Sequence, residues 1–391
     1  MRMVTFGKSR VIRRDRVRRQ GLGIVALCPF YSCWVESGGL GDPVASRAWC
    51  VQAAAMLACP AVLEDPDAGR SWLPGDLAVA VRALQAHRVK CAERRAWPAC
   101  RVLAGEEECM ESAPSRTAVF AAVSRGLFRL ETASPWVLDD VLALVLVGPV
   151  WQQLRDQFDP LFPGPVRREA RAAVCTRSRY AEDRLAAGAF TQYVILGAGL
   201  DSFAWRRPDL LGSLAVFEVD HPASQAWKLE RVRELGLPLS DSQVFVPVDF
   251  EAGGSWLKGL ATAGFDAGQP AVVVSTGVSM YLTKDAITAT LRQVAALAPG
   301  STFAMTFILP LELADPEARP GLELAQKGAR ASGTPFISFF TPEEMLALAR
   351  AAGFKKVQHV SAATLAQRYF AGRADGLRPP NNSEELLVAT T

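Results

Sequence analysis

Two glycines and two aspartates, each placed after an apolar stretch, are the residues whose types and spacing point most directly to chemistry. Gly197-Ala-Gly199 follows the stretch Gln192–Leu196, and Asp201 comes shortly after it. A second, largely apolar stretch, Leu214–Val219, leads to Asp220, about 20 residues beyond the glycines. Glycine accepts positive φ and lets a backbone approach a ligand closely, and a carboxylate at this spacing meets ribose hydroxyls. The pattern predicts a site for an adenosine-containing ligand.

The glycine turn alone does not identify that ligand. The third glycine of the dinucleotide fingerprint would fall at Ser202 and is missing. A strand-to-loop turn without a ligand would also read G-x-G, and Asp220 by itself could cap a helix or lie in a solvated loop. An NAD-dependent oxidoreductase and a non-catalytic adenosine-ligand binding protein therefore stay open as alternatives, although the chain shows no Ser/Tyr/Lys constellation for hydride transfer.

The elements that must position these residues are strands alternating with helices. Apolar, β-rich stretches predict strands at residues 192–196, 214–220, 243–250, 271–277, 301–309, 356–360 and 384–390. Helical spacing of apolar residues and helix start and stop signals predict helices at residues 115–130, 139–146, 149–158, 166–187, 284–298 and 341–353, and another that begins at His221. This alternation implies a mostly parallel, doubly wound sheet with ligands at the carboxyl ends of its strands.

Two segments carry more specific expectations. Residues 310–340 are loop-rich and are expected to form an insertion over the site. The helix at 166–187 is rich in arginine, and most of that charge is expected to form a solvated face. Arg177 and Tyr180 are the exceptions, because this helix leads directly into the strand of the glycine turn. His221 is expected to cap a helix or to lie in a loop.

Composition sets the outer limits. Half of the 391 residues are hydrophobic, which permits a large core, and a net charge of +3 indicates no nucleic-acid partner. The apolar run at residues 21–35 is too short to predict a membrane span, so a cytoplasmic protein is expected. Cysteines gather before Met110 without a C-x2-C repeat, so no metal site is predicted; they are Cys28, Cys33, Cys50, Cys59, Cys91, Cys100 and Cys109. We therefore expect residues 1–109 to be a poorly ordered or non-native extension and residues 110–391 to form the functional domain.

Five segments in a fixed order carry a resemblance to a known family: Thr176–Asp183, Ile195–Asp201, Phe217–Pro222, Pro247–Phe250 and Gly277–Thr283. Together they resemble the leucine carboxyl methyltransferase family, and more closely its bacterial branch of S-adenosylmethionine-dependent O-methyltransferases. The resemblance extends from about Ser112 to Thr391. It implies a class I methyltransferase, Rossmann-like α/β fold with an N-terminal helical region and seven strands in the order 3-2-1-4-5-7-6, the last strand antiparallel.

The resemblance also implies S-adenosylmethionine as cofactor and assigns contacts with it by position. Arg177 would pair with the carboxylate of the methionine moiety, and Asp220 would accept both ribose hydroxyls. Asp249 and Phe250 would flank the adenine, while the two glycines let the chain pass close to the ligand. The predicted cofactor-binding residues are Arg177, Gly197, Gly199, Asp201, Asp220, Asp249, Phe250 and Thr276.

One departure from the family bears on the acceptor. Members that methylate proteins end the fourth strand with an acidic residue, where this chain has Thr276. The resemblance then implies methyl transfer to an oxygen, a carboxylate or a hydroxyl, of a small molecule rather than of a protein carboxyl terminus. A carboxylate needs no base, whereas a hydroxyl needs one. Tyr281, Tyr180 and His221 are the candidate bases, with the two tyrosines as the predicted catalytic residues. The oligomeric state stays open, with a monomer favoured over an oligomer.

Overall fold

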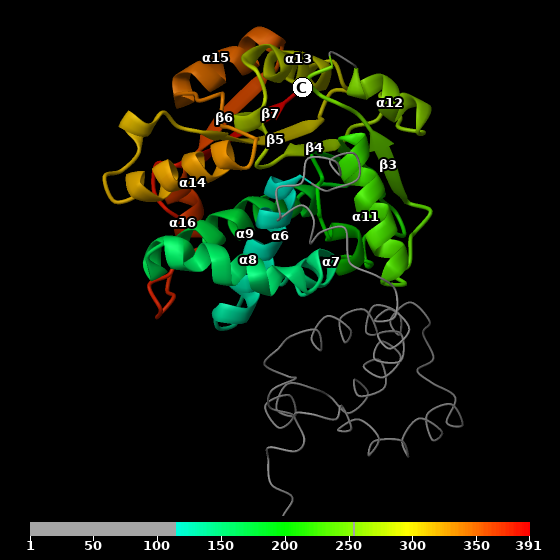
Figure 1. Ribbon diagram of the computed structural model, residues 1–391. Coiled ribbons are helices and arrows are strands. Elements are labelled where there is room, and N and C mark those ends of the chain that lie inside the picture. The colour runs from blue at the N-terminus through cyan, green and yellow to red at the C-terminus, as the bar shows by residue number, and fades with distance from the viewer. Residues whose placement is uncertain (1–114, 253–254) are drawn as a thin grey trace, which may run out of the picture.

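The computed structural model describes residues 115–391 except 253–254, and in that part of the chain it is an α/β structure built on one seven-stranded sheet (Figure 1). The expected extension, residues 1–109, lies outside the described residues. The strands are β1 (Gln192–Leu196), β2 (Ala215–Asp220), β3 (Gln243–Pro247), β4 (Val272–Ser275), β5 (Thr302–Ile308), β6 (Lys356–Val360) and β7 (Glu384–Thr390). They lie in the order β3-β2-β1-β4-β5-β7-β6, which confirms the predicted order.

The direction of β7 decides which residues meet at the functional edge of the sheet. The pairs β1–β2, β1–β4, β2–β3 and β4–β5 are parallel, so their carboxyl ends share one edge. Strand β7 runs antiparallel to both β5 and β6, as predicted. Its first residue, Glu384, is therefore paired with Ile308 at the carboxyl end of β5. The beginning of β7 thus reaches the edge at which the other strands end.

Helices cover both faces of the sheet (Figure 1). They are α6 (Arg116–Glu131), α7 (Ala143–Val147), α8 (Val150–Phe158), α9 (Gly164–Ala186), α10 (Phe203–Arg206), α11 (Pro222–Glu234), α12 (Trp256–Thr262), α13 (Lys284–Ala295), α14 (Arg319–Ala331), α15 (Pro342–Ala352) and α16 (Ala362–Phe370). Short 3-10 turns are η4 (Asp159–Leu161), η5 (Ser279–Tyr281) and η6 (Leu311–Leu313). In the part of the chain that the structure describes, no helix is long and apolar enough to cross a membrane.

The sheet is buried on both sides, which explains why its strands are apolar at nearly every position. Val194 and Leu196 of β1 face a core shared with helices α12, α13 and α15. Tyr193 and Ile195, the alternate residues, face a second core shared with α9 and α16. The side chains alternate because successive residues of a strand point to opposite faces. The two cores hold the strand ends, and hence the glycine turn, in a fixed place.

Most predicted elements are confirmed, and two expectations need correction. Thr341 and Glu344 form the capping box that starts α15, and Gly353 ends it with a φ of 110°. Residues 310–340 are not a plain loop, because Arg319–Ala331 forms the helix α14. The arginine-rich α9 was expected to be largely solvated, but Arg171 is 5% exposed and forms ion pairs with a glutamate of α6 and an aspartate of η4.

Candidate functional site

The glycine turn after β1 requires glycine at both predicted positions. Gly197 has a φ of 73° and Gly199 a φ of 49°, a region that side chains other than glycine rarely adopt. A Cβ on Gly197 would collide with Val278, and one on Gly199 would lie 2.8 Å from the Cβ of Ala118. The amide of Gly197 donates to the carbonyl of Val219 on β2, at 2.8 Å. The turn is therefore bare, tightly curved and tied to the neighbouring strand.

Asp220 lies directly beside this turn, as the spacing predicted. Its Oδ2 accepts a hydrogen bond from the amide of Gly199, and its Oδ1 accepts one from the amide of His221 at 2.6 Å. Burial raises the pKa of Asp220, although the amides of Gly199 and His221 act in the opposite direction. The structure thus brings together the glycine turn and the carboxylate that were singled out first, with the carboxylate held in place by backbone donors.

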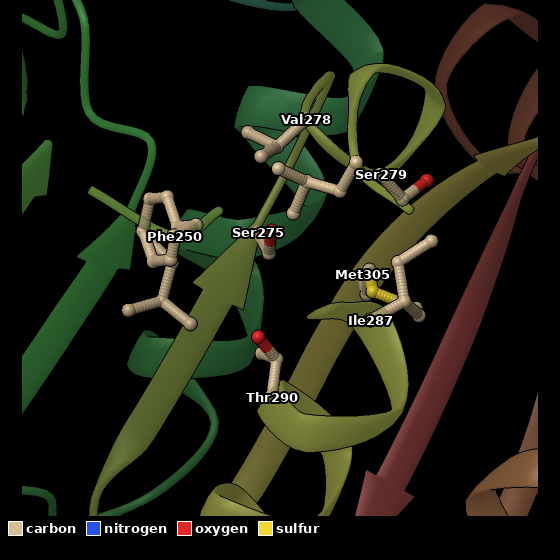
Figure 2. Close-up of a pocket in the computed structure, with 9 residues that line it drawn as sticks. Phe250, Ser275, Val278, Ser279, Ile287, Thr290 and Met305 are labelled. Carbon is tan, nitrogen blue, oxygen red and sulfur yellow. The ribbon is translucent and has the colours of Figure 1, made fainter. Parts of the chain in front are cut away.

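The residues after β3 and β4 form the next part of this edge. Asp249 is exposed, accepts a hydrogen bond from the amide of Glu251 at 2.9 Å and lies 3.9 Å from Nε2 of His221. Phe250 faces Val278 across a small, largely apolar cavity at the end of β4 (Figure 2). His221 is the N-cap of α11, where its ring accepts a hydrogen bond from the amide of Ala223. The capping role expected for His221 is confirmed.

Arg177 reaches the same edge from α9 and meets a partner that the sequence did not suggest. Its Nη1 lies 2.7 and 2.9 Å from the two carboxylate oxygens of Glu384, the first residue of β7. Its guanidinium also packs against Gly277, which follows β4 with a φ of 72°. A Cβ on Gly277 would lie 2.8 Å from that Nη1 and closer still to Nη2. Thr276, half-buried, is the residue between Gly277 and the end of β4.

The two tyrosines proposed as catalytic lie in different surroundings. Tyr281 belongs to η5, where its ring packs edge-on against Phe336 at 5.4 Å. Burial raises the pKa of the Tyr281 phenol to about 12, with Arg177 acting in the opposite direction. Tyr180 is 4% exposed in the core beneath α9, and its ring lies under the guanidinium of Arg368. Tyr281 is thus at the site beside Arg177, whereas Tyr180 has the contacts of a core residue.

Asp201, the acidic residue that follows the glycine turn, has hydrogen bonds to neighbouring segments of the protein. Its Oδ1 accepts a hydrogen bond from the amide of Phe203 at 2.7 Å, which starts the short helix α10. Its carbonyl oxygen accepts one from Nζ of Lys228, also at 2.7 Å. In this structure Asp201 shapes the end of the glycine turn.

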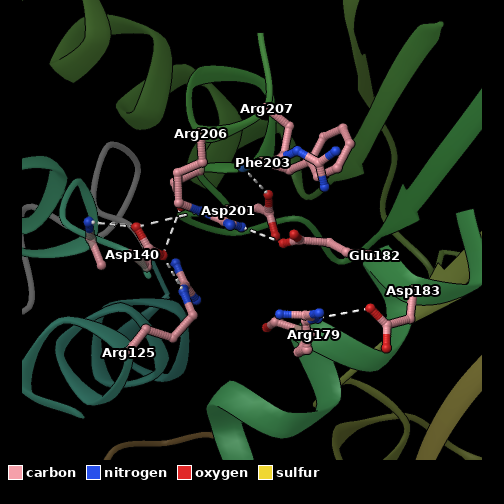
Figure 3. A network of polar contacts seen from close by, with 12 residues as sticks. Arg125, Asp140, Arg179, Glu182, Asp183, Asp201, Phe203, Arg206 and Arg207 are labelled. Carbon is pink, nitrogen blue, oxygen red and sulfur yellow. Dashed lines mark hydrogen bonds and ion pairs between the residues drawn. The ribbon is translucent and has the colours of Figure 1, made fainter. Parts of the chain in front are cut away.

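A buried network of charges, which sequence reasoning missed, supports the glycine turn from behind (Figure 3). Asp140 is fully buried and accepts hydrogen bonds from Nε of Arg125 and from Oγ of Ser202, both at 2.7 Å. Arg125 also donates to the carbonyl of Leu200, at 2.7 Å. Arg206 donates to Oγ of Ser202 at 2.9 Å and pairs with Glu182 of α9. The turn is therefore anchored by residues from α6, α9 and the loop before α7.

The charges of this network stabilise one another. Burial alone would raise the pKa of Asp140, but Arg206 and Arg125 outweigh that effect and hold it below its ordinary value. Asp140 is therefore ionised at neutral pH. Each of its oxygens has a donor, since Oδ1 also accepts the amide of Ala143 at 3.0 Å.

The arrangement fits the predicted cofactor at both ends. The positive-φ glycines form a turn without side chains beside Asp220, and the carboxylate of Asp220 suits a vicinal diol. Arg177 offers the planar donors that suit a carboxylate. In the described part of the chain, no three or more His, Cys, Asp or Glu side chains are grouped to hold a metal ion.

The chain is similar in sequence to known proteins. The family model for leucine carboxyl methyltransferase matches residues 118–295. The "Putative S-adenosyl-L-methionine-dependent methyltransferase YktD" of Bacillus subtilis is 34% identical over 218 residues, which cover 56% of this chain and 69% of that protein. A protein of Mycolicibacterium smegmatis with the same general description is 32% identical over 235 residues, covering 58% of this chain and 75% of its own length.

A solved structure shows the same fold. The crystal structure of a DUF574 family protein from Streptomyces avermitilis has a TM-score of 0.50 and 17% sequence identity to this chain. The likeness covers 71% of this chain and 98% of that one.

Proposed function

This chain belongs to the leucine carboxyl methyltransferase family of S-adenosylmethionine-dependent methyltransferases, and from that premise we propose that it methylates an oxygen of a small-molecule acceptor. Within this proposal, the acceptor oxygen belongs to a carboxylate. The observation that carries this proposal is that Tyr281, beside Arg177, has a phenol that keeps its proton. With its pKa raised to about 12, the phenol is neutral at physiological pH and can donate a hydrogen bond but cannot readily take a proton.

Each part of the site would have a defined task. Asp220 and the glycine turn would hold the ribose, and Phe250 would pack against the adenine. Arg177 would hold the carboxylate of the methionine moiety. When bound, S-adenosylmethionine supplies a methyl group already activated on a sulfonium. What the chain must add is alignment of the acceptor oxygen with that methyl group and exclusion of water.

A carboxylate acceptor suits such a site because it is already nucleophilic at neutral pH. A hydroxyl acceptor would need a base, and two of the candidate bases have structural contacts instead. His221 caps α11, and Tyr180 packs in the core beneath α9. Tyr281, held neutral, would instead donate a hydrogen bond that orients the acceptor. Thr276, in place of the acidic residue of protein-methylating members, supports a small molecule rather than a protein carboxyl terminus.

Product chemistry tests the proposal. The full chain is incubated with methyl-labelled S-adenosylmethionine and matched panels of small carboxylic acids, alcohols, phenols, amines and peptides ending in leucine. Release of S-adenosylhomocysteine identifies the accepted panel, and mild alkali then frees labelled methanol from a methyl ester but not from an ether or an N-methyl group. We expect alkali-labile label with the small acids. Stable label on amines would refute oxygen methylation, and label on the peptides alone would refute the small-molecule acceptor.

A further inference from the structure

A carboxylate from a distant strand lies where the fourth strand lacks one. Strand β4 is followed by Thr276 and Gly277, with no acid. The guanidinium of Arg177 packs on Gly277, and the carboxylate of Glu384 lies 2.7 Å from the same guanidinium. Because β7 is antiparallel, its first residue comes to the edge at which β4 and β5 end. Glu384 thus brings an acidic group next to the position that Thr276 leaves without one.

The pair of Arg177 and Glu384 is shielded but accessible to a ligand. The side chain of Arg177 is 14% exposed and that of Glu384 is 12% exposed. Both contacts between the two side chains use Nη1 of Arg177, whereas Nη2 lies against Gly277. An ion pair with this much exposure can exchange one partner for a ligand group without leaving a fully buried, uncompensated charge, which would be costly.

The charges of the pair match those of an amino acid. The methionine moiety of the expected cofactor carries a carboxylate and an ammonium on the same carbon, so a complementary site needs a cation and an anion side by side. On the basis of the proposed function, we infer that Glu384 binds the ammonium while Arg177 binds the carboxylate. The resulting ring of four alternating charges leaves neither protein group unpaired when the ligand enters.

Glu384 has a second conceivable role, as a clamp that only orients Arg177. The two roles differ in what they require of the ligand. A clamp matters only for ligands with a carboxylate, because it acts through Arg177. A direct contact with the ammonium matters for every ligand that has the amine, whether or not it has the carboxylate.

Three thioether ligands separate these roles: S-adenosylhomocysteine, its decarboxylated amine and 5′-deoxy-5′-methylthioadenosine, which has neither group. Their affinities for the full chain and for Glu384→Gln are measured by titration calorimetry, with exposed Glu343→Gln as the control. We expect Glu384→Gln to weaken the first two ligands by about tenfold or more, the loss typical of a charged hydrogen bond. The affinity for the third ligand should change by less than about twofold. Glu343→Gln should leave the affinities for all three ligands unchanged.

Several outcomes would overturn the inference. If Glu384→Gln binds the decarboxylated amine as tightly as the wild type does, Glu384 only orients Arg177. If Glu384→Gln binds S-adenosylhomocysteine as tightly as the wild type or more tightly, Glu384 does not contribute to binding. If Glu384→Gln does not fold, the wild-type chain still decides, because it should bind the decarboxylated amine about tenfold more tightly than the methylthio compound. Failure of the wild-type chain to bind any of the three would refute the cofactor site itself, and with it the proposed function.

Discussion

The two ends of the candidate site are built in opposite ways. Behind the glycine turn, Arg125, Asp140 and Arg206 have side chains that are 8%, 0% and 7% exposed, and their donors and acceptors engage one another. At the end proposed to hold the methionine moiety, the pair of Arg177 and Glu384 lies beside the half-buried Tyr281. The first arrangement fixes a backbone, and the second is a partly exposed ion pair that we propose exchanges its partners with a ligand. The rigid network and the ion pair thus lie at different parts of one edge of the sheet.

Electrostatics explains why the rigid end must be complete. A buried charge without its partner costs several kcal/mol, whereas a fully satisfied network holds its members in one geometry. The carbonyl of Leu200 and the hydroxyl of Ser202 are bound into this network, so the turn cannot relax without breaking it. The pair at the other end is under no such restriction, since each of its charges retains some contact with solvent.

The largest effect should follow from breaking the rigid end. Asp140→Asn removes the charge that both Arg125 and Arg206 face, leaving two buried guanidinium groups under-compensated. We expect the free energy of unfolding to fall by about 3 kcal/mol, measured by urea denaturation. Asp156→Asn, which breaks the exposed pair with Arg155, should cost less than about 0.5 kcal/mol. Similar small losses in both variants would mean that the network does not anchor the turn.

The next effect concerns Asp220, the carboxylate that we propose binds the ribose. Asp220→Ala removes the acceptor for the ribose hydroxyls and for the amide of Gly199. Affinity for S-adenosylmethionine should fall by about 1–3 kcal/mol, the cost of leaving polar groups unpaired. Calorimetry on the folded variant checks this. Unchanged affinity would mean that the adenosine binds elsewhere. The glycine turn and Asp220 would then not form one end of the site.

Sequence reasoning succeeded where the signal is local. The glycine turn, Asp220 and the strand pattern each depend on residues within one crossover, so their spacing was enough to predict their proximity. The strand order and the antiparallel last strand followed from the resemblance to a family. Arg177 was predicted in the same way, and the structure places it at the expected edge.

What could not be predicted depends on contacts between distant segments. Arg125, Asp140 and Arg206 come from three separate elements, and Glu384 lies 207 residues from Arg177. A charge pattern along one helix does not reveal such partners, which is why the arginines of α9 suggested a solvated face. Glu384 also begins a strand, and only the antiparallel direction of that strand brings it to the ligand edge.

A smaller effect is expected at the exchangeable end. Arg177→Ala should weaken binding of S-adenosylmethionine by about 1–2 kcal/mol, because Arg177 must loosen its contact with Glu384 before it gains one with the ligand. Arg177→Lys should lose less, since an ammonium keeps the charge but not the two parallel donors. The exposed Arg168 on the same helix provides the control, and Arg168→Ala should cost at most about 0.5 kcal/mol. Equal, small losses for Arg177→Ala and Arg168→Ala would place the ligand carboxylate elsewhere.

The smallest effect is a dependence of binding on pH, which concerns Asp220 again. Burial raises its pKa above the ordinary value of 3.8, with the amides of Gly199 and His221 and the charge of Lys228 acting in the opposite direction. The ionised carboxylate is the form that would accept both ribose hydroxyls. Affinity should therefore be complete above the raised pKa and should fall as the pH drops through it, at a higher pH than an ordinary aspartate would require.

The loss on acidification cannot exceed that of Asp220→Ala, because protonation removes only the charge of the side chain. Asp220→Asn carries no charge at any pH, so its weaker affinity should stay flat between pH 7 and the acid limit of folding. His221 also acts electrostatically on Asp220, and His221→Asn, which retains a helix-capping side chain, separates its contribution. An equal decline in wild type and Asp220→Asn would assign the pH dependence to another group and leave the carboxylate ionised throughout.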